Sequence, residues 1–283
     1  MREEKYMRHM AVFLAYGENN IQKALDYIIK IISEKEINHF YRYRPDKDYE
    51  VDTLENKQIY LCKPIAYEDD EDCQIKIDEE DIIRHYLEHS GNGYKANNKL
   101  IDEVKRKIRN HPKWSKLMDS MRNDCLVACF TENYDNDYMW TKYANNSMGI
   151  CVEYDIFELL NFIKEKKWVY MPIRYIKDRN KQKDIYFTSK EFNLDRDTVD
   201  EAILKYKLSC MTKNINPYYS EREWRLLEEC PEILKKSTDT GMLYDFIKPK
   251  KIIMGKNIKE NESFYKKVCE YKENNNNIEI VKY

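Results

Sequence analysis

Strand-like and helical segments follow one another in this chain without regular alternation. Apolar and polar residues alternate over Ile37–Arg44, and apolar strand-like runs return at Cys125–Thr131 and Met148–Tyr154. The segments Glu79–His89 and Asp155–Lys166 instead have the pattern of helices. A doubly wound parallel sheet requires strands and helices in steady alternation. We therefore expect an α+β fold, with a mixed, mainly antiparallel central sheet and helical insertions.

The N-terminal segment has the pattern of a helical hairpin. A first helix is expected over Arg2–Tyr16 and a turn over Gly17–Asn19. The second helix would carry one apolar face, made of Ile21, Leu25, Ile28, Ile29 and Ile32. We expect this face to pack against the rest of the molecule, with the hairpin covering residues 1–36 and an α+β domain covering 37–283. The helical pair is also a candidate surface for a homo-oligomer or a neutralising partner.

Composition excludes several classes of protein. The 49 basic and 51 acidic residues give a formal net charge of −2, which removes any global attraction to nucleic acid or a membrane surface. No signal peptide and no run of about 18 apolar residues is present, so we expect a cytoplasmic protein without a membrane partner. The six glycines form neither a Walker loop nor a dinucleotide-binding GxGxxG motif. The eight cysteines contain no CxxC pair, so free thiols and no metal site are expected.

The most informative motif is a short run of acidic, basic and aromatic residues, Ser220-Glu221-Arg222-Glu223-Trp224-Arg225. In an extended strand side chains alternate between two faces, so Glu221, Glu223 and Arg225 would share one face. One carboxylate can pair with the guanidinium, but the second leaves an excess negative charge. A buried position disfavours that charge unless a ligand or a second cation neutralises it. The motif therefore indicates either a structural ion network or a site that stabilises positive charge at a reacting carbon.

Two other segments combine aromatic and charged residues. Arg42 and Arg44 would share one face of a strand, and an inward-facing arginine suits phosphate or carboxylate because its planar fork donates hydrogen bonds in pairs. The alternative is an edge strand with a solvated basic face. Trp140 and Tyr143 are three residues apart on a helical turn, and Gly149 permits close backbone approach there. These aromatic residues can stack on a base or a nicotinamide ring, or they can belong to the core.

Six segments, in this order, resemble a bacterial family catalogued as domain of unknown function 2971. They are Tyr41-Arg42-Tyr43, Ile59-Tyr60-Leu61-Cys62-Lys63-Pro64, Cys129-Phe130-Thr131-Glu132 with Met139-Trp140-Thr141-Lys142-Tyr143-Ala144, Gly149-Ile150-Cys151-Val152-Glu153-Tyr154, Tyr219-Ser220-Glu221-Arg222-Glu223-Trp224-Arg225, and Ile252-Ile253-Met254-Gly255. Together they cover most of residues 41–283. The chain departs from the family in its acidic loop, residues 67–72, where the usual Phe-Asn-Asp-Pro-Phe-Asp is not found.

The order of a basic strand, an aromatic element and a late Glu-x-Glu strand is similar to ADP-ribosyltransferases. This resemblance implies that NAD is the co-substrate, with arginines on its pyrophosphate or ribose and aromatic residues on its nicotinamide. It implies cofactor-binding roles for Arg42, Arg44, Tyr43, Trp140, Tyr143 and Arg225. Glu223 would be the catalytic carboxylate that stabilises an oxocarbenium-like transition state, and Glu221 would orient the acceptor.

Three functions follow as hypotheses. The first is an NAD-consuming ADP-ribosyltransferase or NAD glycohydrolase, which acts as a bacterial toxin or antiviral defence effector and, as a transferase, modifies a protein or nucleic-acid acceptor. The second is a magnesium-dependent nuclease or phosphodiesterase with oxygen ligands from Asp69, Asp72, Glu153, Glu221 and Glu223. The third is a non-catalytic module that senses a nucleotide-like ligand through Trp140, Tyr143 and the arginines.

Overall fold

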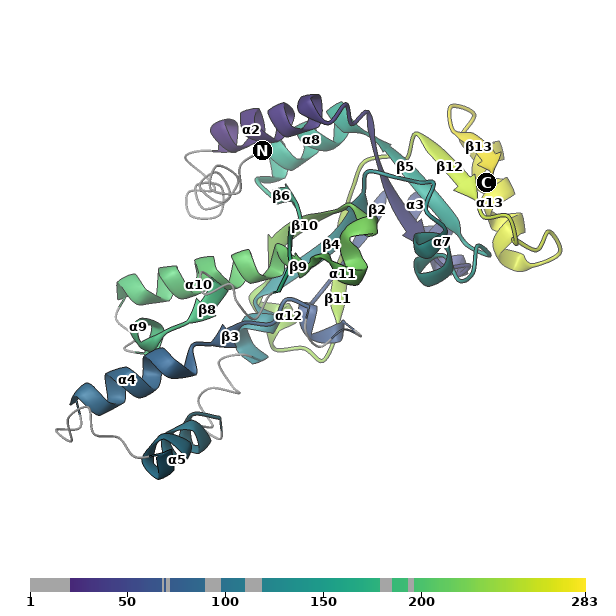
Figure 1. The fold of residues 1–283 in the computed structure, drawn as a ribbon. Coiled ribbons are helices and arrows are strands. Elements are labelled where there is room, and N and C mark those ends of the chain that lie inside the picture. The colour runs from purple at the N-terminus through teal and green to yellow at the C-terminus, as the bar shows by residue number, and fades with distance from the viewer. Residues whose placement is uncertain are drawn as a thin grey trace.

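The structure is a computed structural model that describes residues 21–67, 69, 72–89, 98–109, 119–178, 185–192 and 196–283. These residues form an α+β fold around a mainly antiparallel central sheet, which confirms the predicted fold class (Figure 1). The helix expected at Arg2–Tyr16 and the turn after it lie outside the described residues.

Nine of the described strands form the central sheet. Along its main path they are β11 (Gly241–Asp245), β2 (Gln58–Cys62), β4 (Cys125–Thr131), β1 (His39–Arg44), β5 (Ile150–Asp155), β12 (Lys251–Met254) and β13 (Glu279–Lys282). Beside β4 lies β10 (Glu223–Glu229), followed by β6 (Val169–Pro172). All these pairs are antiparallel except β12 with β13.

Strand β4 is the centre of the sheet, because three strands pair with it. Its partner β10 pairs with all seven residues from Cys125 to Thr131 and so occupies one edge. The other edge is shared: β1 joins it at Thr131, and β2 joins it at Val127. Strands β1 and β2 therefore part from each other along β4, and the sheet is open between them.

Two small parallel sheets lie beside the central one. Strand β3 (Lys76–Ile77) pairs with β8 (Tyr186–Phe187), and β7 (Arg174–Ile176) pairs with β9 (Thr212–Asn214). The sequence predicts one strand over residues 168–175, but the structure divides it into β6 and β7. The division occurs at Ile173, because the backbone changes partner there: Ile173 N donates to Glu223 O, whereas Arg174 N donates to Met211 O.

The helices form two groups, one near the central sheet and one at an end of the molecule. Near the sheet lie α3 (Asp48–Glu55), α7 (Asp137–Tyr143), α8 (Ile156–Lys166), α11 (Ile215–Tyr218), α12 (Glu232–Lys235) and α13 (Ser263–Asn274). Figure 1 shows a second group away from β12 and β13, made of α4 (Glu79–His89), α5 (Asn98–Arg109), α9 (Ser189–Phe192) and α10 (Arg196–Cys210). Short 3₁₀ turns cover Pro64–Ala66 and Tyr219–Glu221. No described helix is long and apolar enough to cross a membrane.

Helix α2 (Ile21–Glu34) packs on α8 with an apolar face, as expected for the second helix of the hairpin. Leu25, Ile28 and Ile32 are buried in the main core. Ile29 was predicted on the same face but is 48% exposed. The buried positions 24, 25, 27, 28, 31 and 32 form one stripe along the helix, and position 29 lies at the margin of this stripe.

Candidate functional site

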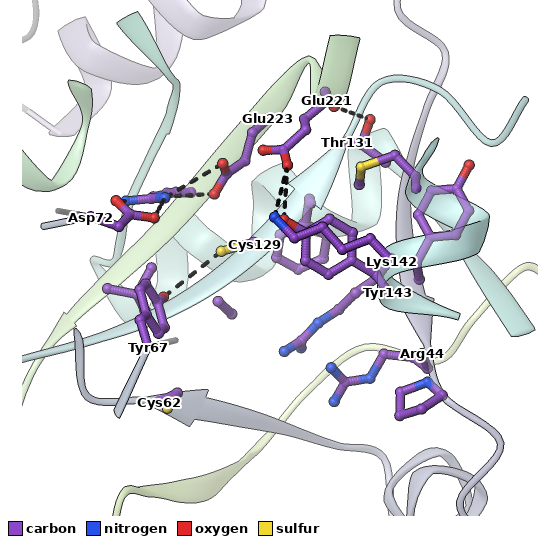
Figure 2. Close-up of a pocket in the computed structure, with 18 of the residues that line it drawn as sticks. Arg44, Cys62, Tyr67, Asp72, Cys129, Thr131, Lys142, Tyr143, Glu221 and Glu223 are labelled. Atoms are coloured by element: carbon purple, nitrogen blue, oxygen red, sulfur yellow. Dashed lines mark hydrogen bonds and ion pairs between the residues drawn. The ribbon is translucent and has the colours of Figure 1, made fainter. Parts of the chain in front are cut away.

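A cavity of about 920 Å³ opens where β1 and β2 part (Figure 2). Its walls come from β1, β2, β4, the start of β10, helix α7, strand β9 and the segment before β3. The cavity has two differently charged sides. One side holds a cluster of buried carboxylates with their cations, and the other holds arginines of β1; the charged residues in the lining are Arg42, Arg44, Lys47, Asp69, Asp72, Lys142, Lys213, Glu221, Glu223 and Arg225.

The two glutamates of the Glu-x-Glu motif reach the cavity, but from different backbone conformations. Strand β10 begins at Glu223, whereas Glu221 ends a 3₁₀ turn. Between them Arg222 is left-handed, with φ 43°. The expectation of one continuous strand across the motif was therefore wrong. The side chain of Glu221 nevertheless reaches the same cluster as Glu223. The backbone carbonyl of Glu221 is fixed by a hydrogen bond from Thr131 Oγ1 at 2.6 Å.

Lys213 of β9 joins the two glutamates. Its ammonium lies 2.7 Å from Glu223 Oε2, 3.0 Å from Glu221 Oε2 and 3.6 Å from Asp72 Oδ2. Burial lowers the pKa of Lys213, but the carboxylates outweigh that effect and hold it well above its ordinary value. Lys213 is thus a buried, charged lysine with three carboxylate neighbours.

Arg225 is the anchor of the cluster. Its side chain is 0% exposed. Its terminal nitrogens bind Asp72 in a bidentate pair at 2.8 and 2.6 Å, and Nε donates to Glu223 Oε1 at 2.6 Å. Burial opposes the ionisation of Glu223, but Arg225 and Lys213 lower the pKa of this carboxyl to about 2. Glu223 is therefore a fixed negative charge at neutral pH.

Helix α7 supplies the wall next to Glu221. Asn136 caps its N-terminus, since Oδ1 accepts hydrogen bonds from the backbone of Tyr138 and Met139. From the last turn, Tyr143 Oη donates to Glu221 Oε1 at 2.8 Å, and Lys142 Nζ lies 3.9 Å from the same oxygen. Figure 2 shows both side chains extending to Glu221. Burial, followed by the charge of Glu221, raises the pKa of Tyr143.

Trp140 lies in the core, away from the cavity. Its ring is 0% exposed, stacks on Tyr283 at 4.7 Å and meets Tyr43 edge-on at 5.1 Å. Its Nε1 donates to Tyr134 O at 2.9 Å. The predicted role of Trp140 as a stacking wall for a ligand does not fit this position, and the ring of Tyr43 packs in the same core cluster. Tyr143 packs against the margin of this cluster, and its hydroxyl reaches the cavity at Glu221.

The basic side of the cavity comes from β1. Arg42 is buried, and its Nη2 donates to Tyr60 O at 3.0 Å, across the opening between β1 and β2. Among the described residues no carboxylate forms an ion pair with Arg42. Burial and the charge of Arg44 lower the pKa of its guanidinium to about 10, which still leaves it charged at neutral pH. Arg44 pairs with Glu50 at 2.7 Å, and Figure 2 shows Arg44 across the cavity from Glu221 and Glu223.

Gly149 allows the loop after α7 to approach β1 closely. A Cβ atom at this position would overlap the carbonyl oxygen of Arg44. A glycine is therefore required where the loop crosses the end of the arginine strand, as its sequence context indicated.

Charge counting shows what the acidic side can do. Its three carboxylates face two buried cations, Lys213 and Arg225, which leaves one formal negative charge inside the protein. Lys142, at 3.9 Å from Glu221, is the nearest further cation and is 39% exposed. The cavity can thus stabilise a positive charge at its acidic side and an anion at its arginine side. Within the described ranges no group of three or more His, Cys, Asp or Glu side chains is arranged to hold a metal ion.

One family model matches part of the chain. Residues 139–226 match the family described as protein of unknown function (DUF2971). The match includes α7, β5 and the Glu-x-Glu motif, which are three of the segments that suggested the resemblance. No curated protein and no solved structure matches the chain.

The residues that sequence reasoning missed are the lysines of the cluster. Lys213 follows α10 without any motif, and its carboxylate partners lie 8, 10 and 141 positions away. Asp72 was considered as a residue of the acidic loop and as a magnesium ligand, yet it is the bidentate partner of Arg225. The one available signal was the unbalanced charge of the motif, which called for a second cation without identifying it.

Proposed function

We propose that this cavity binds NAD and that the chain cleaves the bond between nicotinamide and ribose. The observation that carries the proposal is that one cavity holds both a buried arginine, Arg42, for which the described part of the chain supplies no carboxylate partner, and a carboxylate cluster of net negative charge. An anion such as a pyrophosphate would supply the partner that Arg42 lacks. The volume of the cavity lies within the range of about 300–1,000 Å³ usual for ligand sites.

In this proposal the carboxylates act through their charge. When the bond between C1′ and the ring nitrogen breaks, its electron pair goes to the nicotinamide, and positive charge develops on the ribose. Glu223, held ionised by Arg225 and Lys213, would stabilise that charge without moving. Water or a macromolecular hydroxyl or amine would then form the new bond to C1′ and lose a proton. Glu221, with Tyr143 on one of its oxygens, would orient that nucleophile.

The structure bears differently on the two other hypotheses. Of the carboxylates suggested for a magnesium site, Glu153 lies apart on β5 beside His39, and the ammonium of Lys213 already lies between Asp72, Glu221 and Glu223. A non-catalytic sensor has one observation in its favour: both oxygens of Glu223 are already bound by cations. Such a protein would use the same cavity and bind NAD without consuming it.

Release of nicotinamide from NAD tests the proposal. We expect the wild-type protein to release nicotinamide, alone or with a cell lysate as acceptor source, and Glu223→Gln to reduce the rate about 100-fold or more. Glu229→Gln is the matched control, because Glu229 lies on the same strand with its side chain 82% exposed. Arg42→Gln should raise KM for NAD.

Two results would contradict the enzyme. One is no release with any lysate; the other is equal release by wild type and Glu223→Gln. Since Glu223→Gln unbalances a buried network, its folding is checked by circular dichroism, and Glu221→Gln serves as a second variant at the same site. If NAD binds without release, the sensor replaces the enzyme. The proposed role as a bacterial toxin or defence effector predicts NAD depletion on expression in cells.

A further inference from the structure

The ammonium of Lys142 is surrounded by aromatic rings at the edge of the cavity. Its Nζ lies 5.0 Å from the ring centre of Tyr143, 5.4 Å from Tyr218 and 5.5 Å from Tyr138. Glu221 completes the surroundings at 3.9 Å. Three electron-rich ring faces and one carboxylate form an aromatic cage of the kind that binds organic cations. We call this group of four residues the cation cage.

Two of the three rings are held in place by hydrogen bonds that do not involve Lys142. Tyr143 Oη donates to Glu221 at 2.8 Å, and Tyr218 Oη donates to Asp69 at 2.7 Å. A second cation beside Tyr218 is Lys213, whose Nζ lies 4.8 Å from the ring and is fixed by its own carboxylates. Removing the ammonium of Lys142 would therefore leave a formed cage and one uncompensated negative charge behind it.

Lys142 itself is weakly held. Its side chain is 39% exposed, its distance to Glu221 is long for an ion pair, and it belongs to the end of a short helix. Exposed ion pairs contribute about 0–1 kcal/mol. A lysine ammonium is also strongly hydrated, so it loses little by moving into water. The resident cation can thus leave the cage at small cost.

We propose that the cation cage is the binding site of a pyridinium ring and that Lys142 occupies it only in the absence of that ligand. This proposal rests on the proposed function, since oxidised NAD carries its nicotinamide as a pyridinium. A pyridinium is a flat, delocalised and weakly hydrated cation, so it gains more from ring faces than an ammonium does. Bond cleavage makes the ring neutral. Lys142 then returns to the cage and favours departure of the product.

Binding of 1-methylnicotinamide, a permanent pyridinium, and of neutral nicotinamide tests the proposal by NMR titration. We expect wild type to prefer the cation. Lys142→Gln should bind the cation about fivefold more tightly, because its competitor is gone, with no change for neutral nicotinamide. Tyr218→Leu should weaken the cation severalfold. Lys256→Gln is the control, since Lys256 also lies over a tyrosine ring, 5.5 Å from Tyr283, but outside the cavity.

The proposal fails if Lys142→Gln binds 1-methylnicotinamide and nicotinamide equally, or if it does not bind 1-methylnicotinamide more tightly than wild type does. It also fails if 1-methylnicotinamide shows no saturable binding to wild type or to Lys142→Gln. These results are separable from the enzyme assay. A protein that binds 1-methylnicotinamide in the expected order but leaves NAD intact would contradict the catalytic proposal and support the cage. A protein that cleaves NAD, but whose affinity for 1-methylnicotinamide is unchanged by Lys142→Gln, would support the catalytic proposal and contradict the cage.

Discussion

Two arginines of this protein show opposite environments for a buried guanidinium. Arg225 is enclosed by hydrogen-bond acceptors, with Asp72 and Glu223 bound at two edges of its guanidinium. Arg42 has one hydrogen bond to a backbone carbonyl and none to a carboxylate among the described residues. A desolvated charge is tolerated when it is paired and is costly when it is not. Arg225 therefore has a structural role, and for Arg42 we propose a bound ligand.

Replacing Arg225 by lysine tests the first half of this contrast. Lysine keeps the charge but cannot form the bidentate pair with Asp72 together with the bond to Glu223. We expect Arg225→Lys to lower the free energy of unfolding by about 3–5 kcal/mol in urea denaturation. The exposed neighbour gives the control: Arg222→Lys should change it by less than about 0.5 kcal/mol. Similar changes in the free energy of unfolding for the two variants would show that Arg225 does not anchor the cluster.

At the scale of elements, the short helix α7 connects the turn that presents Glu221 with the cation cage. Its cap residue Asn136 also donates from Nδ2 to Ser220 O at 2.7 Å, next to the turn that presents Glu221. Its last turn carries Lys142 and Tyr143 into the cation cage. A helix of seven residues has little stability of its own, so its position depends on this cap and on the buried ring of Trp140.

Removal of the cap should therefore affect both stability and binding. Asn136→Ala is expected to lower the free energy of unfolding by about 1 kcal/mol and to weaken 1-methylnicotinamide binding. The matched variant is Asp155→Ala, because Asp155 caps α8 in the same way through Phe157 and Glu158 but outside the cavity. It should show the same loss of stability with unchanged binding. Equal effects of both variants on binding would show that α7 does not position the cage.

Local sequence patterns predicted secondary-structure elements better than they predicted tertiary contacts. The bounds of β4 agree with the apolar run expected at Cys125–Thr131, because this strand lies in the middle of the buried sheet. The turn at Glu221 was missed, since a left-handed Arg222 has no signature in sequence. The partner of Arg225 was missed for a different reason. Asp72 lies 153 positions away, and only the complete fold brings them together.

At the scale of the molecule, the site depends on the opening of the central sheet. Strand β4 carries β10 along one edge and is shared by β1 and β2 along the other. The acidic cluster stands at the start of β10, and Arg42 reaches across the opening to Tyr60 of β2. A ligand that contacts both sides would connect β1, β2 and β10. Such a ligand binds the folded state alone, so it should stabilise the whole molecule.

ADP-ribose, which carries a pyrophosphate and the ribose but no nicotinamide, tests this coupling by thermal unfolding. At about 100 times its Kd it should add about 2.7 kcal/mol and raise Tm by roughly 5 °C for a chain of this size. Arg42→Gln should abolish most of the shift, because the pyrophosphate loses its buried donor. Arg122→Gln is the control, since Arg122 likewise donates to a backbone carbonyl, that of Pro64, but does not line the cavity. An equal shift in both variants would place the phosphates elsewhere and would leave the charge of Arg42 without a ligand to explain it.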